Sequence, residues 1–242
     1  MIFMPGFGRL VAPDARDGNY PMRLRLDPLR DQFFPTGLPL GNRHYFAGPV
    51  LDQGKTGTCV AHGWTAKVNA APIMQKMSIN PYDFYRRIVL VDEWGDNDSE
   101  ATASDELLQN GTSVRAGAKT LISLGYAQSY LWAESGEDVR AWMLAGFGGV
   151  VIGVIWTQHM MQTDADGFVS FSGSHMGGHC VYLNGWNDKV KRGGKIVRAA
   201  RGQNSWGKEW GQSGRFWITL EDLDFAITSN GEACALTEQR VK

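Results

Sequence analysis

The sequence predicts an α+β fold built as two lobes. Residues up to about 146 hold capped, periodic segments typical of helices, whereas the residues after them hold short β-branched runs typical of strands. Segregated helices and strands are typical of α+β proteins, and a cleft between lobes is a common site for chemistry. The length of 242 residues suits one sizeable domain or two closely packed lobes.

The first segment, residues 1–47, is predicted to be an irregular arm. Six prolines punctuate it and its apolar residues show no sustained period. Such an arm can dock on a larger assembly, or it can cover a cleft. The compact domain is then expected over residues 48–242, with a mainly helical lobe at 48–146 and a mainly β lobe at 147–242.

Three helices are predicted from caps and apolar periodicity. They run from Cys59 to near Pro72, from about Val114 to Leu124, and from Ser135 to Gly146. Their expected N-cap residues are Thr58, Ser113 and Ser135. The strands are expected in the apolar run GGVVIGVIW (148–156) and in four later segments: GFVSF, HCVYLNGW, GKIVRAARGQNSW and GRFWITL.

Composition narrows the partners and the compartment. The net charge of −1 favours neither nucleic acid nor an anionic membrane, and no window approaches a membrane span of about 20 apolar residues. The chain has three cysteines, whereas a disulfide framework usually has more of them and an even number. The N-terminus does not resemble a secretory signal. We expect a protein of a reducing compartment such as the cytoplasm, or of an assembly built in one.

The stretch DQGKTGTCVAHGW (52–64) places Cys59 where a glycine-bearing loop enters a predicted helix. A thiol reacts as the thiolate, and the N–H groups and dipole at a helix N-terminus favour that negative charge. Cys59 is therefore a candidate nucleophile. The alternative is that it is a small buried apolar residue, the usual environment of a free cysteine.

Two later stretches contain residues that could serve such a nucleophile. His179 lies in GGHCVYLNGW (177–186), and Asn204 lies in GQNSWGKEWG (202–211). A histidine can act as the base for the thiol, and an asparagine carbonyl can fix the tautomer of the histidine. Taken alone, a histidine or asparagine of this kind is more often a structural hydrogen-bonding group.

Together, the three stretches resemble the papain-type cysteine peptidases, especially compact bacterial and phage-like members. The spacing from Gln53 to Cys59 fits the nucleophile motif of that family. GGHCVYLNGW resembles the histidine strand, and NSWGKEWGQSGRFWI (204–218) resembles the asparagine strand and its successor. The resemblance runs from about residue 48 onward. It implies a helical N-terminal lobe, a β-barrel-like C-terminal lobe and an active site in the cleft between them.

The resemblance implies a peptide or protein substrate, no cofactor, and a chain that is cytoplasmic or carried in a phage particle. It also implies a role for each motif residue. Cys59 would form a thioester, His179 would act as general base and then acid, and Asn204 would orient His179. Gln53 would donate its side-chain amide to the oxyanion, a type of contact worth about 3–4 kcal/mol in measured cases. Trp206 would shield the bond between His179 and Asn204 from water.

Further residues are implied to bind substrate. Gly57 and Thr58 would flank the path of the peptide before the nucleophile, and Gly178 would do so before the histidine. Cys180, where the family usually has a small apolar residue, would line the pocket for the second substrate residue. Gln239 is the expected pocket residue nearest the C-terminus.

Other functions remain open from the sequence. Cys59 and His62, with His175, His179 and Cys180, have spacings that could bind zinc, although a zinc site leaves Gln53 and Asn204 unexplained. A papain-like fold could also be a catalytically silent adaptor of a larger assembly such as a phage particle. Acyl transfer to an amine would use the same thioester as hydrolysis.

Overall fold

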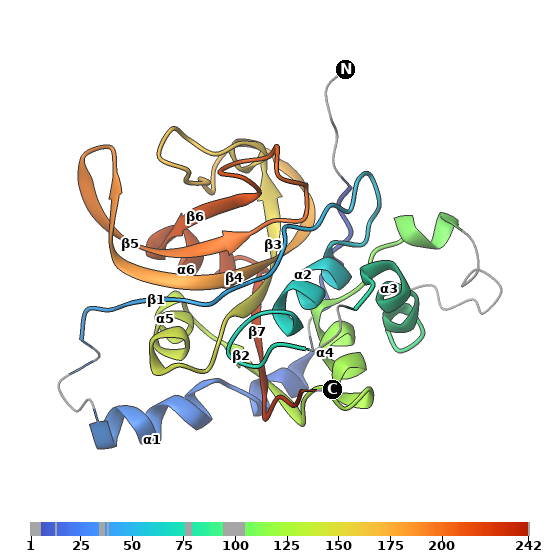
Figure 1. Ribbon diagram of the computed structural model, residues 1–242, viewed down its shortest axis with the longest axis horizontal. Coiled ribbons are helices and arrows are strands. Elements are labelled where there is room, and N and C mark those ends of the chain that lie inside the picture. Colours follow the sequence, from blue (N-terminus) through green and yellow to red (C-terminus); the bar gives the residue numbers. More distant parts are fainter. Residues whose placement is uncertain are drawn as a thin grey trace.

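The computed structural model describes residues 6–12, 14–33, 37, 39–75, 79–93 and 105–241. It confirms the mixed α+β class. Helices α2, α3 and α4 gather on one side of the molecule and the long strands β4, β5 and β6 on the other (Figure 1). Residues 1–5, 13, 34–36 and 38 of the expected arm lie outside the described part of the chain.

The α-helices are α1 (Arg23–Phe33), α2 (Cys59–Val68), α3 (Pro81–Val89), α4 (Val114–Ser123), α5 (Gly136–Ala145) and α6 (Leu220–Thr228). The strands are β1 (Asn42–His44), β2 (Ser129–Ala133), β3 (Val150–Thr157), β4 (His175–Arg192), β5 (Lys195–Gln203), β6 (Arg215–Thr219) and β7 (Glu232–Thr237). The described residues also form the short 3-10 helices η1 (Ala15–Asn19), η3 (Asp105–Gln109) and η4 (Gln158–Met161).

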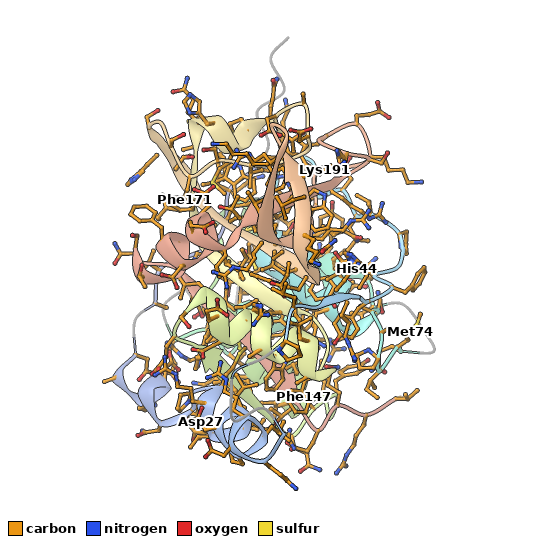
Figure 2. All side chains as sticks on the ribbon, turned by 90° about the vertical axis from the view of Figure 1, so that its left-hand side faces the viewer. Asp27, His44, Met74, Phe147, Phe171 and Lys191 are labelled. Atoms are coloured by element: carbon orange, nitrogen blue, oxygen red, sulfur yellow. The ribbon has the colours of Figure 1, made fainter. Side chains whose placement is uncertain are left out.

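The strands form one seven-stranded sheet in the order β2-β7-β3-β4-β5-β6, with β1 added to β4. All of these pairs are antiparallel. Strand β4, 18 residues long, pairs with β1, β3 and β5, and its register with β5 shifts at two points. In Figure 2 the β4–β5 hairpin, which carries Lys191, projects near one end of the molecule, and α1 with Asp27 lies at the opposite end.

The interior of the protein has two apolar clusters that share the central strands. One contains Val151, Cys180 and Tyr182 and packs against the helices α2, α3 and α4. The other contains Ile152 and Val181 and fills the β part. Successive residues of a strand point to opposite faces, so β3 and β4 supply both clusters by alternation. Strand β4, which carries His179, is therefore held from both sides.

Most of the expected elements are confirmed. The helices that start at residues 59, 114 and 136 are present, and the hydroxyls of Ser113 and Ser135 accept the capping N–H bonds predicted for them. The segment GFVSF (167–171) is not a strand. It contributes only an isolated bridge from Phe168 to Trp217. The first helix ends at Val68, before the expected end near Pro72.

The expectation of an irregular arm is wrong in two places, because the arm contains helix α1 and strand β1. Among the described side chains of the α1 region, only Met22 and Leu26 reach the core, and two residues are too few to establish an apolar period. Pro28 sits inside α1, but both it and Leu24, whose carbonyl loses its partner, are exposed to water. The sequence rules for helix ends therefore miss this element.

Candidate active site

Cys59 is the first residue of α2 and is fully buried. Thr58 holds the N-cap position, but its side chain makes no capping hydrogen bond, contrary to the prediction. Its hydroxyl instead lies 3.2 Å from Nδ1 of His62 and is also paired with Thr56. The N–H groups at the start of α2 are therefore left free of the expected side-chain cap, next to the thiol.

His179 and Asn204 form the hydrogen bond that the sequence motifs predict. Nε2 of His179 lies 2.8 Å from Oδ1 of Asn204, in a fully buried environment. His179 comes from β4, and Asn204 directly follows β5, the antiparallel partner of β4. The backbone N–H of Asn204 donates to Gly214, which fixes the amide relative to the sheet.

Trp206 covers this pair. Its ring stacks on the imidazole of His179 with centroids 4.5 Å apart, and Trp156 meets the same imidazole edge-on at 4.9 Å. The burial lowers the pKa of His179 to about 4, although the bond from Asn204 acts in the opposite direction. His179 Nδ1 is buried and has no hydrogen-bond partner.

Gln53 connects the nucleophile loop to the asparagine segment. Its Oε1 accepts from the hydroxyl of Ser205 at 2.6 Å, and its backbone N–H donates to the Ser205 carbonyl at 2.8 Å. Its Nε2 donates to the carbonyls of Thr56 and Gly6. The side chain is thus held in place, and its amide also donates to a carbonyl from outside the nucleophile loop, that of Gly6.

The thiol of Cys59 is neutral in this arrangement, in contrast to the ionised thiol that its helix position favours. Burial raises its pKa to about 11, although the backbone N–H groups of Cys180, Gly8 and Val60 lower it. Because Cys180 follows His179 directly, the N–H of Cys180 places the sulfur beside the histidine strand. Burial thus keeps both the thiol and the imidazole uncharged.

Residues 6–12, which we call the cleft strap, lie against both the nucleophile loop and the start of the histidine strand. Gly8 N–H and Arg9 N–H both donate to the carbonyl of Gly178, at 3.1 and 3.0 Å. On the other side, Thr112 N–H donates to Gly8 at 2.8 Å, and Leu10 N–H donates to Thr112 at 2.9 Å. The strap therefore pairs with backbone from both halves of the molecule, and Figure 1 shows it as the dark-blue stretch beside α2.

The strap fits because glycines allow close backbone contact. A Cβ atom on Gly8 would lie 1.8 Å from the carbonyl oxygen of Gly57, and one on Gly6 would lie 2.0 Å from that of Thr56. A Cβ on Gly178 would similarly meet the Arg9 carbonyl oxygen at 2.0 Å. The predicted substrate-binding residues Gly57 and Gly178 are thus the residues that a peptide backbone contacts here.

Three residues of the site, Phe7, Arg9 and Glu232, lie outside the sequence motifs. Phe7 of the strap packs edge-on against the rings of His179 and Trp206, each at 5.9 Å. Arg9 pairs with Glu232, the first residue of β7. The only hint in the sequence was the run GFGRL at the start of the chain, whose glycines suit a segment that passes close to another backbone.

Gln239 and Cys180, which we expected to line substrate pockets, have different surroundings. Gln239 accepts a hydrogen bond from Lys67 at the C-terminal end of α2, about 12 Å of helix from Cys59. It is therefore not a cleft residue. Cys180 is buried with its sulfur against Gly63 of α2, and burial raises the pKa of its thiol.

The residues proposed above as zinc ligands do not come together. His62 Nδ1 is engaged by Thr58, and His175 is exposed at the start of β4. Among the residues that the structure describes, no group of three His, Cys, Asp or Glu side chains is placed to hold a metal ion. The three cysteines are free and buried, and no helix in the described ranges is long and apolar enough to cross a membrane.

Comparisons with known proteins give a match by structure only. No family model matches the chain, and no curated protein matches it by sequence. The solved structure of xylellain, a cysteine protease from Xylella fastidiosa, superposes with a TM-score of 0.61 at 15% identity, covering 98% of this chain and 97% of that one. The fold is that of the papain-like cysteine proteases.

Two other papain-like structures show the same likeness. Digestive procathepsin L 3 of Tenebrio molitor covers 84% of this chain and 71% of its own, with 13% identity and a TM-score of 0.58. Bromelain from Ananas comosus matches over 79% of this chain and 94% of its own, with 15% identity and a TM-score of 0.53. The papain-like fold thus extends over nearly the whole chain, including the helical and β parts that flank the strap.

Proposed function

We propose that the protein is a cysteine peptidase that hydrolyses peptide bonds through a thioester on Cys59. The observation that carries the proposal is the buried bond between His179 and Asn204, next to a thiol at the start of a helix. The papain-like fold supports it, because these residues hold the positions that the motifs assign to catalysis. Gln53, anchored by Ser205, completes the set.

The residues of the site account for each proton transfer and each bond change in the reaction. Nδ1 of His179 has no partner and takes the thiol proton of Cys59 as the sulfur attacks the substrate carbonyl. The resulting oxyanion is stabilised by the Gln53 side-chain amide and the Cys59 backbone N–H. The C–N bond then breaks, and His179 gives the proton to the leaving amine. Water, activated by the same imidazole, hydrolyses the thioester.

The strap must leave before any of this occurs, so the form described here is latent. Gly6 places its carbonyl at Nε2 of Gln53, at 3.1 Å, but the strap group at the sulfur is the N–H of Gly8. For acylation, the carbonyl group whose oxygen contacts Gln53 must also place its carbon atom at the sulfur of Cys59. The strap is therefore an occupant of the cleft that is not positioned for cleavage.

The test is to expel the strap from the intact chain. Gly8→Ala places a methyl group 1.8 Å from the Gly57 carbonyl oxygen, so the strap cannot seat, whereas Gly18→Ala places one in open space. We expect an epoxide thiol probe to label Gly8→Ala at least about tenfold faster than the parent, since several hydrogen bonds worth about 0.5–1.5 kcal/mol each are lost. Gly18→Ala should match the parent.

The same variants separate the peptidase from its alternatives. Gly8→Ala should hydrolyse a fluorogenic peptide mixture, and adding Cys59→Ala should abolish both labelling and hydrolysis. The silent-adaptor alternative is favoured by one observation, the filled cleft, and it predicts no hydrolysis even after the strap is expelled. Transfer of the acyl group to an added amine, in place of water, would appear in the product mass. Labelling that persists without Cys59 would disprove the nucleophile assignment.

A further inference from the structure

A small internal cavity lies beside Asn204, between helix α2 and the strands β4 and β5, which run next to each other (Figure 1). It leaves about 10 Å³ that a water-sized sphere can occupy, which is room for one water molecule. Helix α2 contributes His62 to its wall, and the end of β5 contributes Gln203 and Asn204. These three residues are only 1%, 3% and 2% exposed, so the cavity is deep inside the protein.

Two residues of the cavity wall each have a buried polar atom without a hydrogen-bond partner. They are Nδ2 of Asn204 and Oε1 of Gln203. The opposite ends of the two amides are engaged. Oδ1 of Asn204 lies 2.8 Å from Nε2 of His179 and accepts from the N–H of Ser205, while Nε2 of Gln203 donates to the carbonyl of Pro49. One donor and one acceptor thus remain, and leaving such groups unpaired in the interior is costly.

His62 supplies a third polar atom to the cavity wall. Its Nδ1 lies 2.9 Å from the backbone carbonyl oxygen of Thr58, a group that only accepts, so Nδ1 carries the ring proton. Burial lowers the pKa of His62 to about 4, so the ring is neutral at neutral pH. In this tautomer Nε2 is an acceptor.

The hydrogen-bonding capacities of the three atoms match those of one water molecule. Nε2 of His62 and Oε1 of Gln203 only accept, whereas Nδ2 of Asn204 only donates. A water in the cavity therefore gives one hydrogen to His62 and one to Gln203, and it accepts from Asn204. Three partners are the usual number for a buried water.

From these placements we propose that His62 is a positioning residue for the pair of Asn204 and His179, and that it acts through a buried water. Since both hydrogens of the water are used, it offers Asn204 only a lone pair. The amide must then turn Nδ2 to the water and Oδ1 to His179.

The bridge bears on the reaction through the tautomer of His179. With Oδ1 of Asn204 at its Nε2, the imidazole carries its proton there and keeps Nδ1 free as the base for Cys59. An amide turned the other way would set a donor against a donor. The catalytic consequence rests on the peptidase function proposed above, whereas the water site is tested without turnover.

The first test is a crystal structure of the full-length chain. It should show one water within about 3.2 Å of Nδ2 of Asn204, Oε1 of Gln203 and Nε2 of His62. A cavity without a water in contact with these three atoms would overturn the proposal.

The second test compares two variants of His62 in the isotopically labelled full-length chain. His62→Phe keeps a ring and removes both nitrogens, whereas His62→Gln keeps an amide that reaches the position of Nε2. By NMR, the N–H at Nε2 of His179 should exchange with solvent about fivefold or more faster in His62→Phe, the factor that corresponds to one net hydrogen bond. His62→Gln should stay close to the parent rate.

The matched control is Thr65→Val, which removes another buried hydroxyl without a partner from α2, outside the cavity wall. It should exchange at the parent rate. The same acceleration in Thr65→Val would overturn the proposal, because the effect would then belong to α2 as a whole. Equal rates in His62→Phe and the parent, or in the two His62 variants, would overturn it too.

Turnover separates this proposal from the peptidase function. In Gly8→Ala with Cys59 intact, His62→Phe should lower kcat about threefold to tenfold and leave KM nearly unchanged, because His62 acts on Asn204 and not on the peptide. His62→Gln should restore kcat. Faster exchange at His179 without hydrolysis by any variant would remove the peptidase and leave the water bridge. Hydrolysis with an unchanged kcat in His62→Phe would leave the peptidase and overturn the positioning role.

Discussion

At the scale of single residues, the site is built from groups whose charge is suppressed by burial. The thiol of Cys59 and the imidazole of His179 are individually suited to form an ion pair, yet burial under the strap moves both pKa values towards the neutral forms. His62, one turn along α2, is affected in the same way, and its pKa is lowered to about 4. The charge states of these side chains therefore depend on how far they are exposed to water.

This dependence predicts that the folded protein loses stability in acid. His62 and His179 have pKa values of about 4 in the folded chain and about 6.5 in the unfolded chain. Between these values the unfolded chain binds more protons, so the free energy of unfolding falls as the pH is lowered from 6.5 towards 4. Each histidine should cost about 1–2 kcal/mol by pH 5.

The measurement is the urea midpoint between pH 7.5 and pH 5, a range above the ordinary titration of carboxylates. His62→Gln should reduce the slope of the midpoint against pH, because one of the two groups is gone. A midpoint that stays constant or rises on acidification would contradict the burial argument.

At the scale of elements, close contact between helices positions the nucleophile. Helix α4 passes α2 so closely that a Cβ on Gly117 would lie 2.3 Å from Cδ1 of Trp64. The indole N–H of Trp64 donates to the carbonyl of Val114 at the start of α4, at 3.0 Å. This contact holds the helix that begins at Cys59 against the helix that follows the Thr112 edge of the cleft.

Gly117→Ala tests this contact by setting two effects against each other. In an ordinary helix interior, alanine is favoured over glycine by up to about 1 kcal/mol. Here the overlap with Trp64 should win, since overpacking in a dense core typically costs about 1–3 kcal/mol. We expect a lower urea midpoint. Gly18→Ala, in open space, serves as the control, and a midpoint for Gly117→Ala above that of the parent would show that α4 can move away freely.

The elements also show what the sequence can reveal and where it stops. Capped helices and the β-branched run at 148–156 were predictable because their signals are local, in residues such as Ser113 and Ser135. Strand β7 was missed because EACALT is short, and its place is fixed only by pairing with β2 and β3. The motifs located Cys59, His179 and Asn204, since each motif keeps its residues within a few positions.

The strap was not predictable as an occupant of the cleft. Its contacts join Gly8 to residues about 50, 100 and 170 positions away, and no local pattern encodes such pairs. For the same reason Glu232 could not be identified as the partner of Arg9, and Gln239 was chosen wrongly. Docking of the arm on a larger assembly stays a prediction.

At the scale of the whole molecule, the two apolar clusters are joined through shared strands. Leu121 lies in the cluster of the helical side and Leu183 in that of the β side, and both are fully buried. Because β3 and β4 contribute side chains to both clusters, neither half keeps its interior when the other unfolds. The molecule should therefore unfold as one cooperative unit.

Leu121→Ala and Leu183→Ala test that expectation as a pair. Each should lower the free energy of unfolding by about 2–5 kcal/mol through lost burial and a cavity. Tryptophan fluorescence and far-UV circular dichroism should report the same single transition in both variants. Two separated transitions in either variant would show that the lobes unfold independently.

The cleft strap has one more consequence, for any ligand added from solution. A segment covalently joined to its own binding site competes at an effective concentration that commonly reaches the millimolar range. A reversible inhibitor measured on the full-length chain would therefore report an affinity weakened by this internal competitor. The intrinsic affinity of the groove would emerge only in a variant such as Gly8→Ala, and the ratio of the two affinities would measure how strongly the protein binds its own beginning.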